Sequence, residues 1–304
     1  MPLSKEILEL LKSSPPPNIL GVEGARKARE EMQKIIPKVD FPGGAVEDRM
    51  VNTAKRETPV RIYTPGGVGP HPALIYMHGG GFIMGDLESH DPICRYIAKT
   101  INCVVINVDY GLAPEHKFPE PVEECYEIAK WVRQKAKDIY IDPGRIAVAG
   151  DSAGGNLSTV LCLLARDSGD ISFVYQVLFY PPTDLFEDPE SKFEHEELRL
   201  TPEDVAFFNR CYLRDPEDGK NPLASPLLAD NLTELPPALV ITAERDPLKK
   251  EGERYAKRLA DAGVEIIHKR YPIIHGFISF LGLVEEAEEA LAFACGELSK
   301  AFTL

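Results

Sequence analysis

The chain has 304 residues, of which 44% are hydrophobic and 27% charged, and its formal net charge is −14. This composition predicts a globular protein rather than a disordered or membrane-embedded chain, and the negative charge argues against nucleic acid as a partner. The sequence has neither a leader pattern at its N-terminus nor a long apolar run, so we expect a cytoplasmic protein without integral membrane association.

Strand-like and helix-like segments alternate along most of the chain. We predict eight strands, which begin at Val46, Val60, Ala73, Cys103, Arg145, Val174, Ala238 and Val264. Helical patterns lie near residues 91–101, 120–138, 153–166, 249–262 and 284–300. The later strands are short, continuous and rich in Val, Ile and Leu, as strands covered on both faces are. The alternation predicts an α/β fold with a mostly parallel eight-stranded sheet flanked by helices.

Two regions do not fit this alternation. Residues 1–44 contain helical stretches and proline-rich breaks but no strand, and residues 185–215 carry another helical segment without a strand. Because ligands bind at the carboxyl ends of the strands in open α/β sheets, we expect both regions to form a helical cap over a pocket. The core would then comprise residues 45–184 and 216–304. The alternative is that both regions are surface helices on the flanks.

Three consecutive glycines follow the third predicted strand in "MHGGGFIMGD". After an early strand, His-Gly-Gly-Gly is a motif whose backbone amides form an oxyanion hole, so Gly79–Gly81 are expected to aim their N–H groups at a substrate. His78 is expected to orient this loop. A flexible glycine loop and a phosphate cradle are the alternatives, and the second is disfavoured because no lysine follows as a P-loop requires.

The stretch "RIAVAGDSAGGNL" places Ser152 where a buried strand passes directly into a helix. The pattern Gly150-x-Ser152-x-Gly154 in this context is that of a nucleophile elbow, a strained turn that raises the serine hydroxyl above the sheet. Side chains at the glycine positions would collide with the strand and the helix. We therefore predict Ser152 as a nucleophile, with a simple helix-capping serine as the alternative.

A base and an acid are expected after the last two strands. His275, in "YPIIHGF", lies just beyond the last strand, where it could reach the serine. Three residues are candidates for the acid: Asp246, Glu244 and Asp184. Asp246 is favoured because it closes the penultimate strand and precedes a proline that can begin the next helix. The order serine, acid, histidine is that of α/β hydrolases.

Five motifs, "HGGGF", "DYGLAPEHKFP", "GDSAGG", "ERDPL" and "HGF", occur in this order over residues 45–300. Through them the chain resembles the hormone-sensitive-lipase-like carboxylesterases of the α/β-hydrolase superfamily. The resemblance implies a triad of Ser152, Asp246 and His275 and a helical cap. It also implies an oxyanion hole made by three backbone amides, those of Gly80, Gly81 and Ala153. Gly111 departs from the family, which usually has arginine there, and this puts a local ion pair in question.

The expected activity is hydrolysis of short- to medium-chain carboxylic esters through an acyl-enzyme, without metal or cofactor. A small apolar ester is the expected substrate, and five apolar residues are expected to line its pocket: Phe82, Met84, Phe207, Phe208 and Phe277. An amidase or formamidase with the same triad is the main alternative. A non-catalytic ligand receptor on this fold is less favoured because no triad residue is replaced. Whether the chain forms a homodimer stays open.

Overall fold

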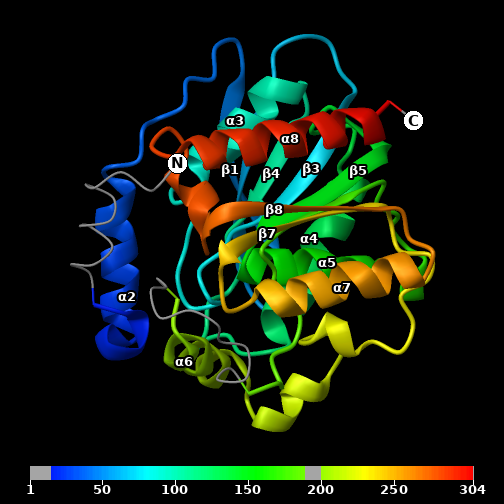
Figure 1. Ribbon diagram of the computed structural model, residues 1–304. Helices are drawn as coiled ribbons and strands as arrows, with labels where there is room; N and C mark the ends of the chain where they lie inside the picture. The colour runs from blue at the N-terminus through cyan, green and yellow to red at the C-terminus, as the bar shows by residue number, and fades with distance from the viewer. Residues whose placement is uncertain (1–14, 189–199, 304) are drawn as a thin grey trace.

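The computed structural model describes residues 15–188 and 200–303. An eight-stranded sheet of order β1-β2-β4-β3-β5-β6-β7-β8 forms its centre (Figure 1). The strands are Ala45–Asn52 (β1), Glu57–Thr64 (β2), His71–Met77 (β3), Val104–Val108 (β4), Ile141–Asp151 (β5), Gln176–Phe179 (β6), Ala238–Arg245 (β7) and Ile266–Ile274 (β8). Strand β2 runs antiparallel to β1 and β4, and every other neighbouring pair is parallel. The predicted mostly parallel eight-stranded sheet is confirmed.

Helices cover both faces of this sheet, with α3 and α8 on one face and α4, α5 and α7 on the other (Figure 1). The α-helices are Pro17–Gln33 (α2), Asp91–Ile101 (α3), Glu120–Gln134 (α4), Ala153–Ser168 (α5), Pro202–Tyr212 (α6), Lys249–Asp261 (α7) and Glu285–Ala301 (α8). Short 3₁₀ helices span Pro216–Lys220 (η2), Pro226–Leu228 (η3) and Phe277–Phe280 (η4). Within the described ranges, no helix is both long and apolar enough to cross a membrane.

The apolar core lies in two layers, one on each face of the sheet. Strand β3 shows why: Ile75 and Met77 face the layer under α4, α5 and α7, whereas Leu74 and Tyr76 face the layer under α3 and α8. Successive side chains of a strand point to opposite faces, and all four of these are fully buried. Both faces of the central strands are therefore apolar, which explains their continuous hydrophobic sequence.

Helices α2 and α6 lie outside the two covering layers and contact each other (Figure 1). The backbone N–H of Asn18 in α2 donates to Asp204 Oδ1 in α6 at 2.9 Å, which joins the two helices. This arrangement agrees with a cap built from two distant segments. The boundaries expected from the sequence, 1–44 and 185–215, include residues 1–14 and 189–199, which lie outside the described residues, so those boundaries stay a prediction.

The first turn of α5 packs onto the end of β3 without space for a side chain at Gly154. A Cβ atom at Gly154 would lie 1.9 Å from the backbone oxygen of Met77, and one at Gly150 would lie 2.3 Å from the backbone of Gly154. The colliding atoms belong to the backbone, so relief would require the helix to move away from the sheet. The position of the turn between β5 and α5 is thus set by backbone packing.

We expect Gly154→Ala to lower the free energy of unfolding by about 3 kcal/mol or more, because overpacking a core costs about 1–3 kcal/mol even where side chains can adjust. Gly169→Ala is the matched control. Gly169 follows the same helix at φ 69° in open space, so only its left-handed backbone should cost about 1–2 kcal/mol. Urea unfolding followed by circular dichroism measures both losses, and equal losses would contradict the packing argument.

Candidate active site

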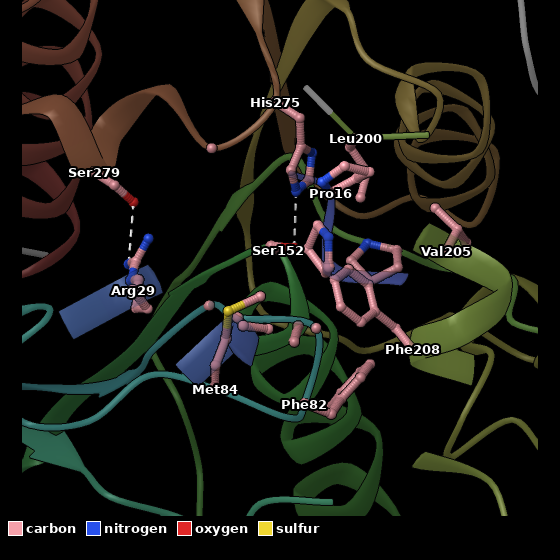
Figure 2. Close-up of a pocket in the computed structure, with 18 of the residues that line it drawn as sticks. Pro16, Arg29, Phe82, Met84, Ser152, Leu200, Val205, Phe208, His275 and Ser279 are labelled. Atoms are coloured by element: carbon pink, nitrogen blue, oxygen red, sulfur yellow. Dashed lines mark hydrogen bonds between the residues drawn. The ribbon is translucent and has the colours of Figure 1, made fainter. Parts of the chain in front are cut away.

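Ser152 occupies the turn between β5 and α5 with φ 51° and ψ −120°. A non-glycine residue with this backbone is strained, and strain of this kind persists only where the surrounding structure enforces it. The packing of Gly150 and Gly154 described above supplies that constraint. The side chain of Ser152 is half-buried and lines a cavity (Figure 2). The structure thus has the strand, tight turn and helix predicted for a nucleophile elbow.

A series of two hydrogen bonds joins Ser152 to an acid through a histidine. His275, which follows β8, lies with Nε2 2.9 Å from Ser152 Oγ, as Figure 2 shows. Its Nδ1 lies 2.7 Å from Oδ2 of Asp246, which follows β7 and is buried. The other oxygen of Asp246 accepts the N–H of Leu248 at 2.8 Å, which fixes the carboxylate. The structure therefore brings together the three residues predicted for the triad.

The two other acid candidates are held elsewhere. Asp184 Oδ1 accepts the backbone N–H groups of Phe186 and Glu187, which stabilises the turn after β6. Glu244 is partly exposed and pairs with Lys249 and Arg270 at 3.1 and 3.0 Å. The hydrogen bonds of His275 go instead to Ser152 and Asp246. The geometry thus favours Asp246 as the acid.

The glycine loop after β3 lines the same cavity as Ser152. Gly80 and Gly81 have φ values of 137° and 60°, and a Cβ atom at Gly80 would lie 2.0 Å from the backbone oxygen of Met84. Among residues 15–188 and 200–303, neither glycine's N–H donates to another group. The N–H of Ala153 begins α5 directly after Ser152. Gly80, Gly81 and Ala153 thus line the cavity together with Ser152, and their use as an oxyanion hole stays a prediction from the sequence.

The carboxylate of Asp151 holds the start of the glycine loop through a hydrogen bond. Its Oδ1 accepts the N–H of Gly79 at 2.9 Å and the O–H of Tyr76 at 3.0 Å, and it lies 3.0 Å from His90 Nε2. Burial alone would raise the pKa of Asp151, but His90, with Arg29 and Tyr76, holds that pKa well below its usual range. Neither Asp151 nor His90 has a local sequence signal for this role, because they meet only in the folded chain.

His78 lies within this loop and is fully buried. One ring nitrogen, Nδ1, donates to the backbone oxygen of Gly79 at 3.0 Å, and the ring stacks on Tyr110 with centroids 4.3 Å apart. Burial lowers the pKa of His78 to about 3, so its ring is neutral near pH 7. Its placement agrees with a residue that orients the loop, as expected from the sequence.

A cavity of about 320 Å³ opens above Ser152, and its walls include three of the five apolar residues expected from the sequence: Phe82, Met84 and Phe208. Two expectations need correction. Phe277 is fully buried in the core beside Tyr180, because the turn at Gly276 (φ 77°) directs its ring away from the cavity. Phe207 packs against the core, since adjacent residues of a helix point in directions about 100° apart.

Further lining residues come from α2, α6 and their flanks and from η4, and no local sequence pattern predicts them individually. The labelled members in Figure 2 are Pro16, Arg29, Leu200, Val205 and Ser279. Most are apolar. Arg29 and Ser279 are polar, and Arg29 brings a cation to the wall of the cavity.

Comparison with known proteins agrees with this geometry. A family model of the α/β hydrolase fold matches residues 74–279. The chain belongs to the α/β-hydrolase family. The carboxylic ester hydrolase LipN of Mycobacterium tuberculosis is 41% identical over 283 residues, which cover 87% of this chain and 75% of LipN. An arylesterase of Saccharolobus solfataricus is 36% identical, with coverage of 91% and 93%.

The solved structure of an esterase from Pyrobaculum calidifontis is 41% identical and superimposes with a TM-score of 0.90, covering 98% of this chain and 99% of that one. The predicted fold is confirmed, and so is the predicted membership of the hormone-sensitive-lipase-like carboxylesterases.

In this α/β hydrolase, Gly111 lies beside an ion pair between Arg56 and Glu124. The N–H of Gly111 donates to Glu124 Oε2 at 2.7 Å, and Arg56 Nε binds Glu124 Oε1 at 2.6 Å. Glu124 is buried, and a buried carboxylate needs such partners. Arg56, from the turn between β1 and β2, therefore forms an ion pair with the buried carboxylate that also binds Gly111.

We expect Asp151→Asn to lower the free energy of unfolding at pH 7 by about 2–4 kcal/mol, because three donors lose a charged acceptor. Because folding lowers the pKa of Asp151, its contribution should be complete above about pH 5 and should be lost progressively as the pH falls further. Urea unfolding of both proteins at pH 7, 5 and 3.5 measures this difference.

The control is Asp48→Asn, which breaks an exposed pair with Arg61 and should cost at most about 1 kcal/mol. A loss for Asp151→Asn that stayed the same at pH 3.5 and pH 7 would show that the charge of Asp151 is not what stabilises the loop.

Proposed function

We propose that this carboxylesterase hydrolyses short- to medium-chain esters, with Ser152 as nucleophile, His275 as base and Asp246 as the residue that orients the histidine. The observation that carries the proposal is the hydrogen-bonded series from Ser152 Oγ through His275 to Asp246, at the wall of a cavity that also holds the glycine loop. Nothing else in the described residues combines a nucleophile, a base and free amides.

In the first half of the reaction, Ser152 Oγ attacks the ester carbonyl while His275 Nε2 takes the hydroxyl proton. The carbonyl oxygen becomes negatively charged and would accept the N–H groups of Gly80, Gly81 and Ala153. His275 then gives its proton to the leaving alcohol, which leaves an acyl group on the serine. Asp246 stabilises the positive imidazole through its hydrogen bond to Nδ1.

Water then attacks the acyl group with His275 again as base, which releases the carboxylic acid and restores Ser152.

The names of the relatives, which include an ethyl acetate hydrolase of Pseudomonas putida, support an ester rather than an amide as the substrate. The cytoplasmic location and the absence of a nucleic-acid partner stay predictions from the sequence, and the homodimer stays open.

An organophosphonate ester should label the protein once, at Ser152, and Ser152→Ala should abolish both labelling and ester hydrolysis without altering the circular dichroism spectrum. Asp246→Asn should lower kcat by about 10⁴-fold, because the wrong histidine tautomer is then favoured. Mass spectrometry of the labelled peptide and steady-state kinetics measure these outcomes.

Glu244→Gln is the matched control for the acid, since Glu244 lies two residues away, is itself partly exposed and pairs with Lys249 and Arg270. Its kcat should stay within about twofold of wild type, because exposed ion pairs contribute little. Retained activity in Ser152→Ala, or a Glu244 variant slower than the Asp246 variant, would overturn the assignment.

Phe208 sets the chain-length limit in this proposal, because its ring packs directly against Gly81, where a Cβ atom would lie 2.6 Å away. A cavity of about 320 Å³ is at the small end for ligand pockets, so butyrate and hexanoate esters should be preferred to palmitate. Phe208→Ala should raise the kcat/KM ratio of decanoate to butyrate by about tenfold.

Phe207→Ala is the control for this change, because Phe207 is the neighbouring residue on α6 but lies outside the cavity. Its decanoate-to-butyrate ratio should match wild type. A palmitate ester as the best wild-type substrate would contradict the chain-length proposal, and faster turnover of a butyryl anilide than of the matched ester would favour an amidase.

A further inference from the structure

The cavity has two unlike sides around Ser152. Figure 2 shows Leu200, Val205 and Phe208 on one side of the serine, and Arg29 with Ser279 on the other. The first side is apolar and suits a hydrocarbon chain. The second side presents a guanidinium from α2 and a hydroxyl from η4. An ester whose two ends were both apolar would leave this second side without a matching group.

Arg29 has few partners for a partly buried cation. Its Nη2 donates to Ser279 Oγ at 3.4 Å, which is a long hydrogen bond, and its Nε is buried without a partner. Within residues 15–188 and 200–303, Arg29 forms no ion pair. A guanidinium carries five N–H donors, and leaving buried donors unfilled costs free energy. Arg29 therefore retains donor capacity at the wall of the cavity.

Arg26, one helical turn earlier on α2, differs from Arg29 because its N–H donors have hydrogen-bond partners. It binds both oxygens of Glu115 at 2.9 and 2.7 Å and donates from Nε to the backbone oxygen of Ile83 at 2.8 Å. The guanidinium of Arg26 thus donates hydrogen bonds to a carboxylate of the same chain. The structure contains no equivalent carboxylate hydrogen-bonded to Arg29 among the residues that it describes.

The nearest competing explanation is that Arg29 only balances the charge of Asp151. Arg29 does help to lower the pKa of Asp151, so the two charges attract each other. However, Oδ1 of that carboxylate is already engaged by Tyr76, Gly79 and His90, and Arg29 is not among its hydrogen-bond partners. Attraction at a distance leaves the N–H groups of Arg29 available to a ligand.

We propose that Arg29 determines specificity by binding a carboxylate on the substrate, so that the preferred ester is a half-ester or another ester with one anionic end. A planar guanidinium matches a carboxylate with two parallel hydrogen bonds, which are stronger than those between neutral groups. The hydrocarbon part of such a substrate would lie on the side of Phe208. This inference rests on the proposed esterase function and replaces the wholly apolar substrate expected from the sequence.

Two pairs of esters of equal shape test the proposal, one for each end of the substrate. Monoethyl succinate is compared with ethyl 4-methylpentanoate, and carboxymethyl butyrate with isobutyl butyrate, by pH-stat titration. In at least one pair, wild type should favour the carboxylate by about tenfold or more in kcat/KM, as expected for charge-assisted hydrogen bonds. Arg29→Met should abolish that preference while the neutral ester of the pair is still hydrolysed.

Lys27→Met is the control, since it removes a positive charge from an exposed position of the same helix outside the cavity. It should leave the preference unchanged even if it slows both esters. Arg29→Lys should keep part of the preference, because it retains the charge but not the planar pair of donors.

Absence of a carboxylate preference in both pairs, or a preference that survives in Arg29→Met, would overturn the inference. An equal loss for both members of a pair in Arg29→Met would show that Arg29 only balances Asp151. Failure of wild type to hydrolyse any of the four esters would instead contradict the proposed function.

Discussion

The buried carboxylate of Asp151 joins the two turns on which the active site depends. It is the last residue of β5, so it precedes Ser152, and it accepts the N–H of Gly79 at the start of the glycine loop. The proposed nucleophile and the glycine loop are thus tied to one side chain. A carboxylate can be kept there only because Tyr76 and His90 also engage it, since a buried charge without partners is costly.

The parallel strands bring the remaining groups to the same edge of the sheet. Ser152, Asp246 and His275 follow β5, β7 and β8, and the glycine loop follows β3, so all lie at carboxyl ends. Each side chain needs only a short turn to reach the cavity. The close contact of Gly154 with Met77 sets the height of the serine above this edge. This packing also holds Ser152 in its strained backbone conformation.

The sequence predicted the features that depend on local backbone and strand order, and it failed where a side chain's direction matters. The elbow around Ser152 and the acid after β7 follow from turn chemistry, whereas Phe277 was misplaced because Gly276 reverses the chain just before it. His90 and Arg29 carry no local signal, since their partners lie far away in the chain and meet them only through tertiary packing. Cap residues are harder still, because no strand register fixes them.

Helix α2 couples substrate recognition to the chemistry of the glycine loop. Arg26 binds the backbone oxygen of Ile83, which lies two residues after Gly81, and this contact holds α2 against the loop. Residues three apart on a helix lie on the same face, so the contact that positions Arg26 also positions Arg29 at the cavity. A shift of α2 would therefore move the guanidinium together with its support on the loop. The distance from Arg29 to the amides of Gly80 and Gly81 is consequently set by the short segment of α2 from Arg26 to Arg29.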